Sequence, residues 1–84
     1  MPETMGPLGL AFAAYVRSRA GALDLKQSDI ADRIGMPRKT FGRYWHGERP
    51  VSIDQMEQII TALGDDFERV RREELRPRID RGDY

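Results

Sequence analysis

Apolar residues recur along this chain at intervals of three and four, the spacing that gathers side chains on one face of an α-helix. The pattern is clearest after Ser52, where the apolar positions are Ile53, Met56, Ile59, Ile60 and Leu63. Ser52 and Gln55 form the capping-box pattern of a helix start, and Gly64 is a typical stop. The pattern therefore predicts an amphipathic helix that begins after Ser52 and ends at Gly64.

Three further helices are predicted before this one. The first carries an apolar face and ends near Gly21; the face consists of Leu8, Ala11, Phe12, Tyr15 and Val16. The second runs from Gln27 to Ile34 and is followed by Gly35, which suits a sharp turn. Pro37 fits the first turn of a third helix that extends to about Trp45 or His46.

A last helical segment is predicted over 65–75, followed by a charged tail. Within it Phe67, Val70 and Leu75 recur at roughly helical intervals. We predict a loose arm over 1–7, a folded domain over 8–75 and a mobile tail over 76–84. Because no alternating β pattern occurs, the fold class is all-α, a bundle of four or five short helices.

Composition limits the kinds of protein that this chain can be. It has 84 residues, no cysteine and a formal net charge of zero. This length suits one domain, and the lack of cysteine excludes disulfides and thiolate metal sites. The longest apolar stretch, 8–16, is too short to cross a membrane, and no basic segment precedes it as in a signal peptide. We expect a cytoplasmic protein.

The balanced total hides an uneven distribution of charge. Residues 1–37 carry four basic and four acidic side chains, and residues 51–84 carry six and nine. The middle segment, 38–50, carries four basic side chains and one acidic one: Arg38, Lys39, Arg43 and Arg49 against Glu48. A local positive patch favours DNA more than the total charge opposes it, because phosphate attraction is screened over about 10 Å.

The predicted third helix separates into an apolar face and a basic face. On a helical wheel the inward set is Pro37, Phe41, Tyr44 and Trp45, and the outward set is Lys39, Gly42 and Arg43, flanked by Arg38 and Thr40. Arginine and lysine on a helix in the major groove can bind guanine O6 and N7. The helix also follows a short helix and a glycine-containing turn, which is the arrangement of a helix-turn-helix.

Gly42 has two interpretations. Glycine inside a helix costs about 1 kcal/mol relative to alanine, so its presence needs a reason. Either no side chain fits where this helix lies against DNA, or the position is structural, with close packing against another helix or simple tolerance of glycine. The sequence leaves both open.

Several short motifs, in order and spacing, resemble one known family. Gln27, Ala31 and Gly35 mark the second helix and its turn, and Ala62, Leu63 and Gly64 close the fourth. Between them lies an RY..GER type of sequence, formed by Arg43, Tyr44, Gly47, Glu48 and Arg49. Over residues 25–64 the chain resembles the Xre/Cro family of phage-type repressors.

The resemblance implies a fold and roles for particular residues. It implies a lambda-repressor-like bundle that binds partly palindromic double-stranded DNA as a homodimer and regulates transcription, acting at the nucleoid. The base-reading positions would be Arg38, Lys39, Gly42 and Arg43. The phosphate-contacting positions would be Gln27, Thr40 and Arg49, and we expect His46 to flank a phosphate. The dimer contact would come from Phe67, Val70 and Leu75, or from the fourth helix.

The chain departs from the family pattern at two places. Many members pair a buried arginine on the first helix with a glutamate at the position of Trp45. We expect Arg19 to stack on Trp45 as a cation–π pair instead. Lys26 stands where a capping serine or asparagine would be expected, which leaves the start of the second helix open.

Other chemistry has little support. His46 is the only histidine, so we predict no metal site, and no motif for a nucleophile, a phosphate loop or a cofactor occurs. We interpret Asp65–Asp66 and Glu73–Glu74 as helix caps or solvated faces, not as catalytic pairs, and we predict no enzyme. Two alternatives remain: an antitoxin or anti-repressor whose segment 65–84 folds on a protein partner, or the DNA-binding half of a longer regulator.

Overall fold

A computed structural model describes residues 6–82 and 84 of the chain. Its elements are α1 (Pro7–Ala22), α2 (Gln27–Arg33), α3 (Arg38–Trp45), α4 (Ile53–Ala62), α5 (Phe67–Val70), the π-helical turn η1 (Arg71–Leu75) and α6 (Arg76–Arg81). No strand occurs in the described residues. The predicted all-α fold is confirmed. Most of the expected arm lies outside the described residues, and Pro7 already belongs to α1.

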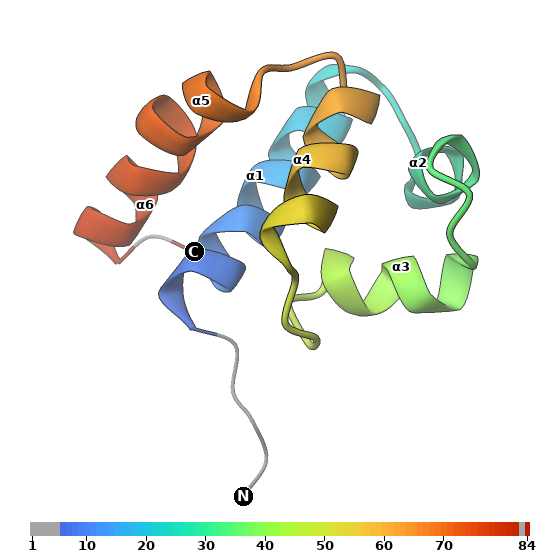
Figure 1. The fold of residues 1–84 in the computed structure, drawn as a ribbon, viewed down its shortest axis with the longest axis horizontal. Coiled ribbons are helices and arrows are strands. Elements are labelled where there is room, and N and C mark those ends of the chain that lie inside the picture. The colour runs from blue at the N-terminus through green and yellow to red at the C-terminus, as the bar shows by residue number, and fades with distance from the viewer. Residues whose placement is uncertain (1–5, 83) are drawn as a thin grey trace, which may run out of the picture.

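Helix α1 runs through the middle of the molecule (Figure 1). It contacts α3 towards one side and η1 and α6 towards the other, while α4 contacts α2 and α5. The pair α2–α3 therefore lies at one end of the molecule and the C-terminal helical run at the other (Figure 1). This arrangement leaves the outer side of α3 uncovered by the other helices.

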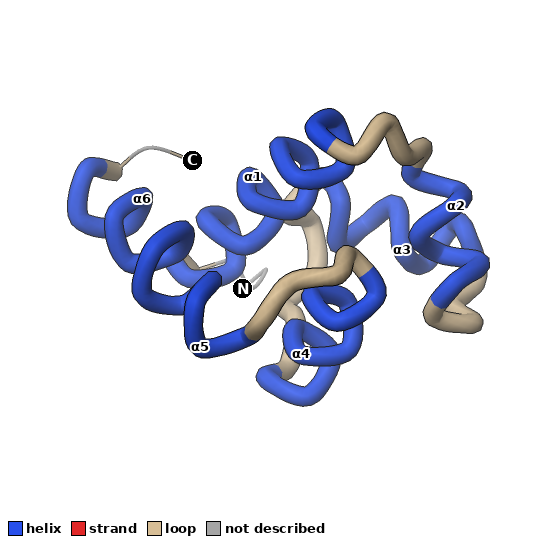
Figure 2. Tube along the Cα trace, turned by 90° about the horizontal axis from the view of Figure 1, so that it is seen from above, coloured by secondary structure: helices blue, strands red, loops and turns tan. Residues whose placement is uncertain are grey.

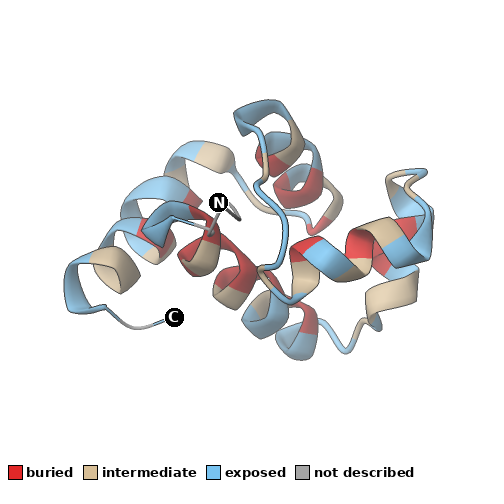
Figure 3. Ribbon diagram, turned by 90° about the horizontal axis from the view of Figure 1, so that it is seen from below, coloured by how far each residue is buried: buried red, intermediate tan, exposed pale blue. Residues whose placement is uncertain are grey.

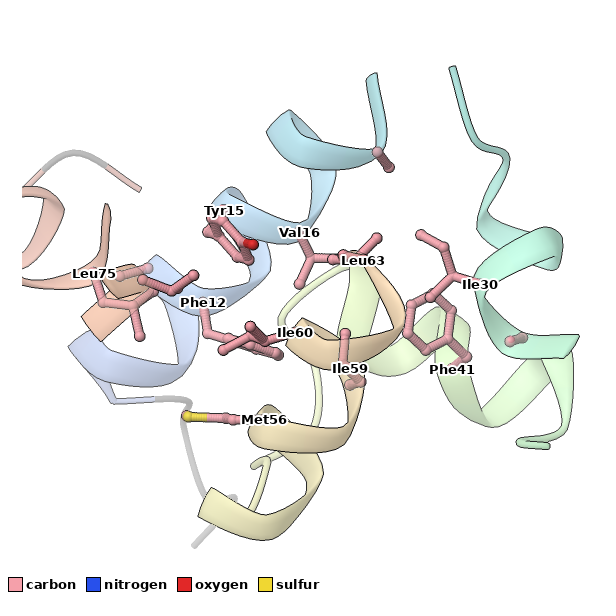
Figure 4. Close-up of a cluster of buried hydrophobic side chains, with 14 residues drawn as sticks. Phe12, Tyr15, Val16, Ile30, Phe41, Met56, Ile59, Ile60, Leu63 and Leu75 are labelled. Atoms are coloured by element: carbon pink, nitrogen blue, oxygen red, sulfur yellow. The ribbon is translucent and has the colours of Figure 1, made fainter. Parts of the chain in front are cut away.

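The predicted apolar faces meet in one core (Figure 4). Its fully buried members come from all the principal helices and include Phe12, Tyr15, Val16, Ile30, Phe41, Met56, Ile59, Ile60, Leu63 and Leu75. Two residues of the predicted apolar faces lie outside this core. Leu8 is exposed, and Ile53 is 54% exposed. Both stand in the first turn of their helix.

The turn between α2 and α3 has the expected geometry. Gly35 has a φ of +67°, in the left-handed region that glycine adopts without a steric penalty. Helix α2 begins at Gln27 without a serine cap, because the Asp29 carboxylate accepts a hydrogen bond from the Lys26 backbone N–H at 2.9 Å. This bond occupies an amide at the helix start and settles the boundary that Lys26 left open.

Helix α4 begins with the predicted capping box. The Gln55 backbone N–H donates to Ser52 Oγ at 3.1 Å, and the Ser52 N–H donates to Gln55 Oε1 at 3.2 Å. The Tyr44 hydroxyl also donates to Gln55 Oε1, at 3.0 Å. One side chain thus caps α4 and ties it to α3.

The C-terminal residues form one helical run from Phe67 to Arg81 (Figure 2). The structure differs here from the mobile tail expected after residue 75, because α6 contacts α1 and Ile79 packs against the core. In this structure the segment therefore packs against its own domain.

Two of the three expected dimer-contact residues belong to the core of a single protomer. Val70 is 0% exposed and Leu75 is 1% exposed, and Phe67 is half-buried against the same cluster. These side chains serve the domain's own packing, which leaves Val70 and Leu75 no free surface for a second copy.

A polar network fastens the C-terminal run to α1. Asp65, whose side chain is 7% exposed, accepts hydrogen bonds from the Tyr15 hydroxyl at 2.9 Å and from Arg69 Nε at 2.7 Å. The hydrogen bonds from Arg69 hold the pKa of Asp65 well below its usual range, and burial together with the bond to Asp65 raises the pKa of Tyr15. Asp66 caps α5 through the Arg69 N–H at 3.0 Å.

Candidate nucleic-acid interface

The inner face of α3 fixes how this helix is presented. Phe41 and Tyr44 are buried, and Trp45 is half-buried with its ring centroid 6.3 Å from that of Phe41. Pro37 is exposed at the N-terminal end, so it does not join the apolar face as the wheel suggested. The apolar side chains anchor α3 across its middle and C-terminal half, which directs the opposite face outward.

The outward face carries the predicted basic residues. Lys39 and Arg43 are exposed, Thr40 is half-buried, and Figure 3, seen from below, shows exposed and buried positions alternating along α3. Within the described part of the chain neither Lys39 nor Arg43 has an acidic partner. Their charges are therefore available to an anionic ligand.

Gly42 lies beside the side chain of Gln27, the first residue of α2. A Cβ built on Gly42 would lie 2.8 Å from Nε2 of Gln27. That distance is shorter than real Cβ contacts allow, so the Gln27 amide occupies the space that a side chain at 42 would take. Because this amide ends a flexible side chain that can move, the contact by itself does not require glycine at position 42. The structure places the Gln27 amide beside Gly42, on the outward face of α3.

Arg38, the first residue of α3, is not a free cation. Its Nε donates to Asp32 Oδ1 at 3.2 Å and its Nη2 donates to Asp32 Oδ2 at 2.8 Å. The pairing lowers the pKa of Asp32, chiefly through the hydrogen bonds from Arg38. Arg38 thus differs from Lys39 and Arg43, although the family resemblance implied one base-reading set for all three.

The loop after α3 holds the other two expected phosphate contacts. His46 is exposed and caps α3 through its backbone N–H, which donates to Gly42 O at 3.0 Å. Arg49 is exposed and its guanidinium carbon lies 5.8 Å from the centroid of the Tyr44 ring. Gly47, with a φ of +70°, turns the chain between them.

The expected stacking of Arg19 on Trp45 is wrong. Arg19 Nε donates to the Leu63 carbonyl at 3.2 Å and lies 3.9 Å from the Asp65 carboxylate, at the C-terminal end of α4. Arg17 instead reaches α3, where its Nη1 donates to the Trp45 carbonyl at 2.6 Å. The arginine that holds α3 thus lies two positions before the one expected to do so.

Sequence reasoning missed two residues at this site, Asp32 and Arg17. Asp32 lies six positions before Arg38 across a turn, so no helical periodicity relates them. Arg17 is exposed on α1 and carried no signal beyond its charge. The described residues contain no group of three or more potential metal ligands. Nor does any helix among them have the length and apolarity to span a membrane.

Comparison with known families agrees with this geometry. The profile of the helix-turn-helix domain matches residues 11–75. The chain belongs to this family. The match includes the whole of α2–α5 and places the α2–turn–α3 unit in a DNA-binding helix-turn-helix domain. No curated protein and no solved structure matches the chain.

Proposed function

We propose that this helix-turn-helix domain is a sequence-specific transcriptional regulator, a repressor of the Xre/Cro type, that places α3 in the major groove of double-stranded DNA. The observation that carries the proposal is the outward face of α3, where Lys39 and Arg43 have no acidic partner in the described structure. The buried inner face holds this helix rigidly enough for its side chains to meet base edges.

Base reading and phosphate binding fall to different residues in this proposal. Lys39 and Arg43 reach base edges, and Arg38 reads a base from the N-terminal end of α3. Gly42 contributes no side chain, and this leaves room for Gln27 to approach the DNA beside α3. In this proposal the phosphate contacts come from Gln27, whose amide lies beside Gly42, and from Thr40, His46 and Arg49 on α3 and the loop after it.

We further propose that two copies bind a partly palindromic operator. Recognition helices of a dimer enter successive major grooves about 34 Å apart, roughly one turn of B-DNA. Because Val70 and Leu75 are buried in the protomer, the contact between copies is made by other residues. A selected DNA motif with two symmetry-related half-sites would support this part of the proposal, and a motif with a single half-site would contradict it.

The test is selection of bound duplexes from a random pool at about 150 mM salt, where purely ionic binding is suppressed. The wild type is expected to enrich a motif with two related half-sites, and Lys39→Ala/Arg43→Ala is expected to lose it. The control is Arg71→Ala/Arg76→Ala, which removes the same charge from two exposed arginines at the other end of the molecule. A motif equally weakened by both pairs would point to bulk charge, and no motif at all would overturn the proposal.

Gln27→Ala separates phosphate contact from base reading. We expect affinity for all sequences to fall about equally, with the selected motif unchanged. Single Lys39→Ala or Arg43→Ala should instead cost roughly 1–3 kcal/mol on the operator and relax the preference at one base pair. Equilibrium binding to the selected operator and to single-base variants measures both.

A further inference from the structure

Asp32 and Arg38 bridge the turn of the helix-turn-helix. Asp32 is the penultimate residue of α2 and Arg38 is the first residue of α3. The carboxylate takes the Nε–Nη2 edge of the guanidinium in a two-point fork, at 3.2 and 2.8 Å. Both side chains remain open to solvent, since that of Arg38 is 68% exposed and that of Asp32 is 57% exposed.

The fork leaves part of Arg38 available to a ligand. A guanidinium has five N–H donors, and Asp32 uses one on Nε and one on Nη2. The remaining donors lie on Nη1 and Nη2, at the end of the side chain. Guanine presents O6 and N7 side by side in the major groove, and two parallel N–H groups match this pair of acceptors. Arg38 can therefore bind Asp32 through one edge of its guanidinium and a guanine through the other at the same time.

The charge of Asp32 adds a second effect. A carboxylate beside Arg38 offsets its positive charge, whereas Lys39 and Arg43 keep theirs. Asp29 also acts electrostatically on Arg38 from α2, although its carboxylate caps the Lys26 amide. An arginine that is neutralised in this way gains less from a phosphate, which any sequence offers, and depends more on a base that presents two aligned acceptors.

We propose that Asp32 is a positioning residue for specificity: it holds Arg38 with its end-on donors free for one guanine and restrains it from binding phosphate. This inference rests on the proposed function, because it assumes that α3 enters the major groove. It assigns Asp32 to recognition although the residue itself need not touch DNA.

The test compares base preference and non-specific binding across a double-mutant cycle. The variants are Asp32→Asn, Arg38→Ala and the two combined. The matched control is Asp80→Asn, which breaks an exposed Asp–Arg pair of the same kind on α6, where Arg76 Nε and Asp80 Oδ1 lie 3.4 Å apart. Each protein binds the selected operator, its single-base variants and an unrelated duplex over a range of salt concentrations.

For wild type, we expect a guanine preference at one operator position that Arg38→Ala abolishes. Asp32→Asn should lower this preference about tenfold and raise affinity for the unrelated duplex a few-fold. Its salt dependence should steepen by about 0.9 in log–log slope, the value for one added phosphate contact. Asp32→Asn should change no base preference in the Arg38→Ala background. Asp80→Asn should leave both measurements at wild-type values.

The outcomes distinguish this inference from the proposed function. If the wild type selects no motif, the proposed function is wrong and the role of Asp32 falls with it. If the motif is found but Asp32→Asn keeps its guanine preference within about twofold, only the role of Asp32 is wrong. The same holds if Arg38→Ala changes no base preference. Thermal unfolding of Asp32→Asn should match wild type within a few degrees, because exposed ion pairs add little stability.

Discussion

At the scale of single residues, the contact between Gly42 and Gln27 gives a direct prediction. In Gly42→Ala the new Cβ would lie 2.8 Å from Gln27 Nε2, so the amide must move away. The amide ends a flexible side chain, and alanine favours the helix by about 1 kcal/mol, so stability should stay equal or rise slightly. DNA affinity should fall, because Gln27 leaves its place beside α3. Thermal unfolding and operator binding measure the two effects.

Gln27→Ala and the double variant are the controls for this prediction. If Gly42→Ala acts by displacing Gln27, the double variant should bind DNA no more weakly than Gln27→Ala. An additive loss would mean that the new methyl group clashes with DNA itself. That was the other interpretation of glycine at this position.

Residue types and helical spacing predicted which side of α3 is buried but not how its side chains pair. Phe41 and Tyr44 are inside, and Lys39 and Arg43 are outside, as the wheel indicated. The Asp32–Arg38 fork joins side chains across a turn, and so depends on where that turn directs α3. The same reason explains why Arg17 and not Arg19 reaches Trp45, since two residues along α1, at about 100° each, point the two side chains to nearly opposite sides of the helix.

At the scale of elements, the cap of α4 carries a stability prediction. Ser52→Ala removes the oxygen that accepts from the Gln55 N–H at 3.1 Å, and should destabilise the domain by about 1 kcal/mol. The control is Ser18→Ala in the interior of α1, where alanine suits the helix as well or better. Chemical denaturation of the two variants measures the difference, and equal stabilities would contradict the role of the cap.

The helices up to Gly64 were predicted nearly to their ends because caps, glycines and apolar spacing agree there. The C-terminal run differs because its signals conflict. Pro77 and the dense charges indicated a tail, yet Pro77 lies inside the helical run, directly after the π-helical turn η1, where the regular α-helical hydrogen-bond pattern is already interrupted. Ile79 then supplies a contact with the core that a single apolar residue among charges did not reveal.

At the scale of the whole molecule, the network around Asp65 joins the two ends of the domain. Asp65 accepts hydrogen bonds from Tyr15 on α1 and from Arg69 in the C-terminal run. At the other end, Arg17 on α1 donates to a backbone carbonyl of α3. We expect Asp65→Asn to lower the melting temperature at neutral pH by roughly 5 °C, because asparagine keeps a hydrogen-bond acceptor for Tyr15 but loses the charge that pairs with Arg69. An unchanged melting temperature would contradict a stabilising role for this network.

The same network predicts how stability depends on pH. The lowered pKa of Asp65 means that its contribution is present above the ordinary aspartate pKa, near 3.9, and is lost as the pH falls through the lower folded-state value. The raised pKa of Tyr15 means that its contribution is present below pH 10 and is lost as the pH rises towards the folded-state value. The free energy of unfolding should therefore decline on both sides of a plateau.

Comparing variants isolates these two groups from the other titrating residues. The difference in unfolding free energy between wild type and Asp65→Asn should be constant from about pH 5 to 9 and shrink towards pH 2, because below the ordinary aspartate pKa the unfolded chain takes up a proton on Asp65 while the folded chain keeps the carboxylate ionised. The difference between wild type and Tyr15→Phe should instead shrink above pH 10. Urea denaturation across this range measures both. A wild-type advantage over Asp65→Asn that persists unchanged at pH 2 would mean that Asp65 stabilises the domain through packing, and that its charge is not what holds α1 to the C-terminal helices.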